Sequence, residues 1–257
     1  MVQKRMNNHM LSIPVWWMAA FGAVLALSAC GDGTPDYFPL RSGADWIYRQ
    51  TVVIENHGNS GGKKTLNLVA AATDLPQRQD GDANLNPRIF ADGRTLYYEK
   101  AKDGVVLVGA RRAFEGGIET IAPRYVIKEP YVKGTSWRES LESQILQRSF
   151  LGMFGTISKP IQVQGEMEFK IESVDDTVHV PAGTFHHCVR IHGAGEAPLE
   201  WGEPFGTLQV AVTTTEWFAP SVGLVKRVRE ESTGHNGPLG ARLQEELEAK
   251  RDRGWLR

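Results

Sequence analysis

A serine, two cysteines and several histidines are the side chains of this 257-residue chain that could carry out chemistry. Ser60 lies in residues 58–62 (GNSGG), which have the G-x-S-x-G spacing of a hydrolase nucleophile. Such a serine must follow a strand and precede a helix, and it needs a base with an orienting acid. The residues from Lys63 onward instead alternate like a second strand, and glycine and asparagine suit a hairpin turn. We therefore predict a turn at Ser60, and we predict that the chain is not an enzyme.

The second candidate is a metal site built from His186, Cys188 and His192. In an unbroken strand these side chains share one face, with Cys188 and His192 about 13 Å apart along it. Zinc ligands must come within about 2.0–2.3 Å of one ion, so that span is too long even with help from His179 or His187. We predict a buried, packed cysteine beside surface histidines, without a metal. The sequence has no phosphate loop or dinucleotide fingerprint, so no cofactor is predicted.

Cys30 is the third candidate, because it follows an apolar leader. Lys4 and Arg5 give this leader a positive start, residues 11–27 carry no charge, and small residues precede the cysteine. These features are typical of a secretory signal. The alternative is a retained membrane helix, but a run of about 17 residues is at the short edge of what spans a bilayer. We expect residues 1–29 to be a signal peptide.

Residues 27–30 (LSAC) resemble the lipobox of bacterial lipoproteins. The resemblance implies cleavage before Cys30, a thioether-linked diacylglycerol on its sulfur, and an acyl chain such as palmitate on its new amine. One acyl chain holds a protein only marginally, whereas two or more anchor it stably to its membrane. Gly31 after the cysteine implies the outer membrane, on the periplasmic side, while Asp32 one step later leaves the inner membrane open.

Without the leader, the chain has a nearly balanced charge and one remaining cysteine. Two of its 29 basic residues lie in the leader and all 30 acidic residues follow it, which leaves a net charge of −3. A nucleic-acid partner would need a basic face, so none is predicted. With Cys30 lipidated, Cys188 has no intrachain disulfide partner, and the core alone must stabilise the fold.

Most of the chain after the leader has the pattern of short strands separated by turns. Residues 46–54 are rich in β-branched and aromatic side chains, and residues 166–172 alternate apolar and charged side chains. We predict a mainly β fold, a curved antiparallel sheet or half-open barrel. The predicted strands are 46–54, 65–70, 95–100, 105–111, 166–172, 178–180, 188–192, 208–218 and 224–229.

Residues 238–253 are the one stretch that favours a helix. Leu239, Leu243 and Leu247 recur at four-residue spacing among strong helix formers, and Glu246 and Lys250 form an i,i+4 pair. We predict a short C-terminal α-helix, either a solvated surface helix or one that binds a partner. The predicted organisation is a signal peptide at 1–29, a lipidated tether at 30–36, a β domain at 37–235 and the helix or tail at 236–257.

Three motifs, in order along the chain, resemble bacterial lipoproteins of the DUF3108-like group, also called TapB-type. They are residues 37–48 (YFPL…G…W…Y), 180–188 (VPAGTFHHC) and 217–226 (WFAPSVGLVK). Ser221 stands where that group usually has glycine, so a differently shaped turn is expected there. The resemblance implies a curved antiparallel sheet and a cupped surface like that of periplasmic lipoprotein carriers, and it implies no established activity.

Residues 150–157 form an apolar segment without strand alternation. Phe150, Met153, Phe154 and Ile157 in this segment are candidate contacts for a membrane or an apolar ligand, because large exposed apolar patches mark interaction sites. The alternative is a loop that covers the open end of the barrel.

These patterns together predict a membrane-anchored periplasmic lipoprotein that acts by binding. The leading expectation is an apolar ligand or lipid held in a cupped β-sheet, by analogy with folds of that shape. The alternative is an envelope assembly module that binds a protein through its sheet edges or its C-terminal helix, without a small ligand.

Overall fold

The structure is a computed structural model of the chain. In the part of the chain that it describes, no helix is long and apolar enough to cross a membrane. The described residues are 34–40, 43–56, 62–75, 85–111, 117–141, 165–202, 206–234 and 239–252.

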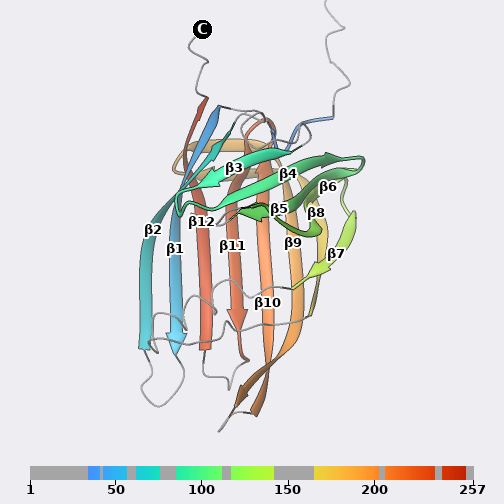
Figure 1. Cartoon of the computed structure of the whole chain (residues 1–257). Coiled ribbons are helices and arrows are strands. Elements are labelled where there is room, and N and C mark those ends of the chain that lie inside the picture. Colours follow the sequence, from blue (N-terminus) through green and yellow to red (C-terminus); the bar gives the residue numbers. More distant parts are fainter. Residues whose placement is uncertain are drawn as a thin grey trace, which may run out of the picture. The chain divides into compact units, whose positions relative to one another are not determined.

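Twelve antiparallel strands form one nearly closed, barrel-shaped sheet across the described ranges. The long strands stand side by side, and β3 to β6 cross them near one end (Figure 1). The order is β6-β5-β4-β3-β2-β1-β12-β11-β10-β9-β8-β7. The strands are β1 (Ala44–Asn56), β2 (Gly62–Asp74), β3 (Asn86–Phe90), β4 (Thr95–Ala101), β5 (Gly104–Arg111), β6 (Glu119–Lys128), β7 (Ser136–Ser140), β8 (Glu166–Val180), β9 (Gly183–Gly202), β10 (Gly206–Ala219), β11 (Gly223–Ser232) and β12 (Leu239–Asp252).

The first and last strands pair with each other, so the gap in the barrel lies between two strands from the middle of the chain, β6 and β7. β1 pairs with β12 along its whole length, while β6 and β7 are the two ends of the strand order. Each six-stranded half begins with the same spacing of proline, glycine and tryptophan. The spacing occurs in residues 39–46, which run into β1, and in residues 130–137, which run into β7. Both glycines, Gly43 and Gly134, have a positive φ, at 87° and 103°. This recurrence favours a duplicated half-sheet.

Side-chain contacts, rather than a full ladder of backbone hydrogen bonds, join β6 and β7 across this gap. The backbone N–H of Tyr125 in β6 donates to the Glu139 carboxylate of β7 at 2.8 Å. The Tyr125 ring also meets the Trp137 indole edge to face, with centroids 6.4 Å apart.

The predicted mainly β, curved antiparallel fold is confirmed, and strands cover every predicted strand range. Tight turns join β4 to β5 and β8 to β9. Gly104 is required at the first of these, because its φ is +146° and an added Cβ would lie 2.2 Å from the Ile127 carbonyl oxygen.

The predicted C-terminal helix is wrong, because residues 239–252 form strand β12. This strand is central in the sheet and pairs with β1 on one side and β11 on the other. The spacing of Leu243 and Leu247 fits one face of a strand as well as one face of a helix, since four is a multiple of two. Pairing on both sides then outweighs the helix propensity of the intervening charged residues.

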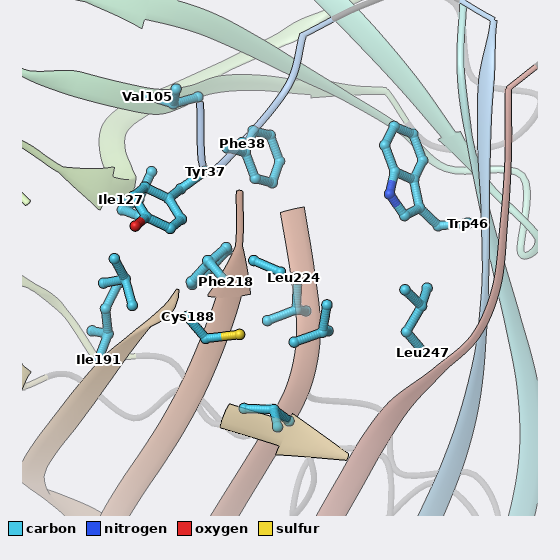
Figure 2. Packing of buried hydrophobic residues seen from close by; sticks show 14 of the residues in the cluster. Tyr37, Phe38, Trp46, Val105, Ile127, Cys188, Ile191, Phe218, Leu224 and Leu247 are labelled. Carbon is cyan, nitrogen blue, oxygen red and sulfur yellow. The ribbon is translucent and has the colours of Figure 1, made fainter. Parts of the chain in front are cut away.

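The inner face of the sheet has two apolar clusters separated by charged side chains. The upper cluster, beneath β3 to β6, holds Trp46, Phe218 and Leu247 (Figure 2). The lower cluster includes Val52, Val210 and Val212. Between the two clusters, the inward side chains are polar: Gln50 on β1, Glu216 on β10, Arg227 on β11 and Glu245 on β12. On β11 this polar row continues beside the lower cluster with the buried Arg229 and Glu231. We call these six residues the charge layer.

Candidate functional site

A short segment before β1 plugs the upper end of the sheet, and we call residues 36–40 the strap. Tyr37 and Phe38 point from it into the upper apolar cluster, where Figure 2 shows them close to Phe218 and Leu224. The Tyr37 hydroxyl donates to the His187 carbonyl at 3.1 Å. The strap is therefore part of the core, although it follows Cys30 by only a few residues.

A buried arginine holds the strap against β1, β3 and β4. The Arg88 guanidinium lies 4.0 Å from the Trp46 ring centroid, 4.5 Å from that of Phe38 and 5.5 Å from that of Tyr98. It donates to the Pro39 carbonyl at 3.3 Å and pairs with the Asp74 carboxylate at 2.5 Å. Cation–π contacts of this kind gain strength when they are desolvated.

The carboxyl group of Asp74 is buried, and burial changes its pKa. Its loss of solvent raises the pKa of the carboxyl to about 6, while the charge and hydrogen bond of Arg88 oppose that rise. A folded-state pKa above the ordinary value means that the native protein holds this proton more tightly than the unfolded chain does. The contribution of Asp74 to stability is therefore greatest at low pH and falls as the pH rises through about 6.

The three motifs that carry the family resemblance meet around the strap. The Trp46 indole N–H of the first motif donates to the Val222 carbonyl of the third at 2.8 Å, and the Tyr48 hydroxyl donates to Leu224 at 3.1 Å. Ser221 of the third motif has φ 59°, the left-handed conformation that glycine favours, and its N–H donates to the Asp36 carbonyl at 2.7 Å. The turn thus has a glycine-like shape, and these segments of the chain together fix the strap.

The histidine and cysteine positions differ in part from the prediction. Cys188 is fully buried in the upper cluster, where loss of solvent raises the pKa of its thiol to about 11. His186, however, is exposed, so the prediction that it shares a face with Cys188 is wrong. The intervening His187 has φ 56° and the β8–β9 register shifts here, which breaks the alternation of the strand. Within the described ranges, no three His, Cys, Asp or Glu side chains come together as metal ligands.

Several predicted positions lie outside the described residues: Ser60, Cys30, Phe150, Met153, Phe154 and Ile157. The strand β2 begins at Gly62, the last residue of the run that contains Ser60.

A different surface, which the sequence did not indicate, lies along the lower part of β2. β3 pairs only with residues 72–74 of this strand, and no other described strand pairs with the same edge below them. Ala71 accepts from the Ala91 N–H and Leu75 donates to Pro87, so odd-numbered residues direct their backbone groups to this edge. Among the described residues, the N–H and C=O groups of Thr65, Asn67 and Val69 therefore have no strand partner.

The side chains of this free edge are unusually apolar. Leu68 and Val69 are 45% and 68% exposed, and they are two of four large hydrophobic side chains with such exposure among the described residues. Leu68 lies opposite Gln50 and so faces inward, whereas Val69 faces outward. We call residues 65–69 the β2 edge.

The two other edges of the sheet are protected in the ways that monomeric proteins use. β6 carries Pro123, which cannot donate a ladder hydrogen bond, and its register with β5 is irregular around this residue. β7 has only five residues. Short strands, prolines and bulges discourage pairing with another chain. The β2 edge contains no proline or bulge, and it belongs to a strand of 13 residues. An exposed strand of this kind is a template for an added strand.

The charge layer, by contrast, is satisfied internally. Arg227 lies between Glu216 and Glu245, at 2.8 Å and 3.0 Å, and Gln50 donates to Glu245 at 2.7 Å. Arg229 pairs with the buried Glu231 at 2.7 Å. The one orphan in this region is the Thr214 hydroxyl, which has no hydrogen-bond partner among the described residues. The layer stabilises the interior and separates the two apolar clusters.

The comparisons with known proteins give little beyond general likeness. No protein family and no curated protein matches the sequence. One similar structure is a Bacteroides fragilis protein described as exported, with a YmcC-like fold: 12% identity, 84% of this chain, 99% of that chain and a TM-score of 0.34. Another is a Parabacteroides distasonis protein described as a lipoprotein: 12% identity, 85% of this chain, 100% of that chain and a TM-score of 0.36. At these scores the likeness carries no conclusion about this chain.

Proposed function

We propose that this chain is a lipid-anchored envelope protein that acts by binding, without catalysis, and that it binds an extended segment of another envelope protein at the β2 edge. The leader and the residues before Cys30 support the anchor. The free backbone groups of Thr65, Asn67 and Val69, beside exposed Leu68, support the binding mode. The unprotected β2 edge is the observation that carries the proposal.

The partner segment has a defined chemistry. Its backbone supplies the hydrogen bonds that Thr65, Asn67 and Val69 lack, and alternate side chains fall on the two faces of the sheet. An apolar residue on the inner side packs against Leu68, which lies at the border of the lower cluster. A second copy of this chain fits less well, because two β2 strands paired antiparallel would direct their strap ends to opposite sides, away from a shared membrane.

An apolar ligand on the inner face is the second candidate function. The lower cluster, with Val52, Val210 and Val212, gives it an apolar lining. The charge layer limits this candidate, since a long apolar ligand could not cross Arg227 and Glu245 without meeting ion pairs. Mass spectrometry of lipid that co-purifies with the delipidated domain separates the two functions.

We also propose membership in the DUF3108-like group and a place on the periplasmic side of the outer membrane. Residues 37–48, 180–188 and 217–226 support the first proposal, since their side chains meet around one strap. Gly31 after the cysteine supports the second.

The anchor has a direct test in a Cys30→Ser variant. A protein held only by lipid on Cys30 is expected to leave the membrane fraction when this sulfur is replaced, and the wild-type N-terminal peptide is expected to carry diacylglycerol in mass spectrometry. A Cys188→Ser variant is the matched control and stays with the membrane. A Cys30→Ser protein that still floats with membranes contradicts the anchor.

Photo-crosslinking from Val69 tests the binding mode in whole cells. A photoreactive side chain at this exposed position is expected to give a discrete adduct with one other envelope protein. Glu168 is the control, because it is exposed on β8 but its strand is paired on both sides. Adducts of equal yield from both positions, no adduct from Val69, or an adduct of two copies of this chain would each overturn the proposal.

A further inference from the structure

The turn between β6 and β7 carries an exposed valine beside the strap. Val132 is 52% exposed and is one of four exposed large apolar side chains among the described residues. Its neighbour Tyr131 packs edge to face against Tyr37 of the strap, with ring centroids 5.0 Å apart. The apolar tip of this turn thus lies beside the segment that leads back to Cys30.

Hydrogen bonds hold the turn rigid, so the exposure of Val132 is built into the fold. The Val132 N–H donates to the Pro130 carbonyl at 2.8 Å, and the Thr135 hydroxyl donates to the same carbonyl at 2.7 Å. The Gly134 N–H donates to the Ile171 carbonyl of β8 at 2.8 Å. A side chain fixed in this way loses little conformational entropy when it meets another surface.

The length of the chain before the strap limits how far this end can stand from a membrane. Five residues lie between Cys30 and Asp36, whose carbonyl is held by Ser221, so the six residue steps reach at most about 20 Å when fully extended. The 20 residues of β9 measure about 65 Å along the domain. A tether this short holds the strap end close to the bilayer and keeps the local lipid concentration high for weak contacts.

We propose that the β6–β7 turn docks on the bilayer surface, with Val132 in the interfacial region and Lys133 at the level of the headgroups. This inference rests on the proposed lipid anchor and deepens it, because it fixes which end of the domain faces the membrane. Exposed charges near this end are of both signs: Lys133 against Asp36 and Asp175. The apolar tip, rather than a net positive charge, therefore makes the contact. The β2 edge then remains open to partners above the surface.

Fluorescence depth measurements on the full lipidated protein test this orientation. The protein is placed in vesicles of phosphatidylethanolamine and phosphatidylglycerol, with an environment-sensitive label on Val132→Cys or on Val69→Cys. Cys188 is fully buried and does not compete for the label. Lipids that carry quenchers in the interface are expected to quench the label at position 132 and not at position 69. Equal quenching at the two positions, or none at 132, overturns the orientation.

A second variant separates a real contact from mere proximity. With the label on Lys133→Cys, the additional change Val132→Asp is expected to reduce quenching about fivefold, the loss that matches burial of half a valine side chain. Unchanged quenching overturns the docking contact. Flotation of each sample with its vesicles is measured in parallel, so that failure of the lipid anchor is recognised separately from failure of the orientation.

Discussion

Arg88→Met is expected to lower the free energy of unfolding by about 3–5 kcal/mol at pH 8, because it leaves the buried Asp74 carboxylate without its cation. The variant also removes the cation from between Phe38 and Trp46 and the donor to the Pro39 carbonyl. Urea unfolding of the soluble domain measures the effect. The loss is expected to shrink toward pH 5, since Asp74 takes up its proton there and no longer carries a buried charge.

The matched control is Arg94→Met. Arg94 also pairs with an aspartate, Asp92, and also lies over an aromatic ring, but both charged side chains are about half exposed. Exposed pairs contribute about 0–1 kcal/mol, so this control is expected to stay close to the wild type. A loss in Arg88→Met no larger than in Arg94→Met, or one that does not change with pH, would show that the strap is held by its aromatic packing alone.

Glu245→Leu has the second largest expected effect, a loss of about 2–3 kcal/mol in the free energy of unfolding. Glu245 is buried and accepts from both Gln50 and Arg227, so its replacement leaves a buried amide and a cation with fewer partners. Arg227 keeps its contact with Glu216, which limits the loss.

Glu246→Leu is the control for this prediction. Glu246 is the next residue of β12, pairs with Lys226 at 3.0 Å and is on the opposite face of the strand. It is expected to change stability by less than about 1 kcal/mol. Arg227→Met is expected to cost less stability in the Glu245→Leu background than in the wild type, because the two residues interact directly. Some loss remains in the double variant, since Arg227→Met also leaves Glu216 without its cation. Strictly additive effects of the two changes would contradict a coupled charge layer.

Strands with a visible alternation were predictable, and the one misassigned element shows the limit of such patterns. Residues 166–172 alternate charged and apolar side chains, and this pattern has one interpretation. Leu243 and Leu247 are four apart, which fits a helix and a strand equally. The pairing of β12 with β1, nearly 200 residues away in sequence, decides between them. No window of sequence contains that information.

The candidate site was less predictable, because its properties arise from distant residues. The residues next to Arg88 in the sequence form no motif that predicts a buried arginine. Its partners Phe38, Trp46 and Asp74 come from three other segments. Of the strands that the structure describes, β3 alone pairs with this edge of β2, and it covers no more than residues 72–74. The burial of Cys188 was predictable, because a free cysteine usually packs as a small apolar side chain. The face of the strand that Cys188 occupies relative to His186 was not predictable, because it depends on the left-handed φ of His187.

Crosslinking from Val69 in an Asn67→Pro background tests the central claim most directly. The Asn67 N–H points to the free edge, so proline removes a donor that a partner strand needs and leaves the hydrogen bonds to β1 in place. Asn67→Ala, which keeps the N–H, is the control. The account predicts that the adduct seen in the wild type persists in Asn67→Ala and is lost in Asn67→Pro, with both variants folded and membrane-anchored. An adduct of undiminished yield in Asn67→Pro would contradict strand addition at the β2 edge.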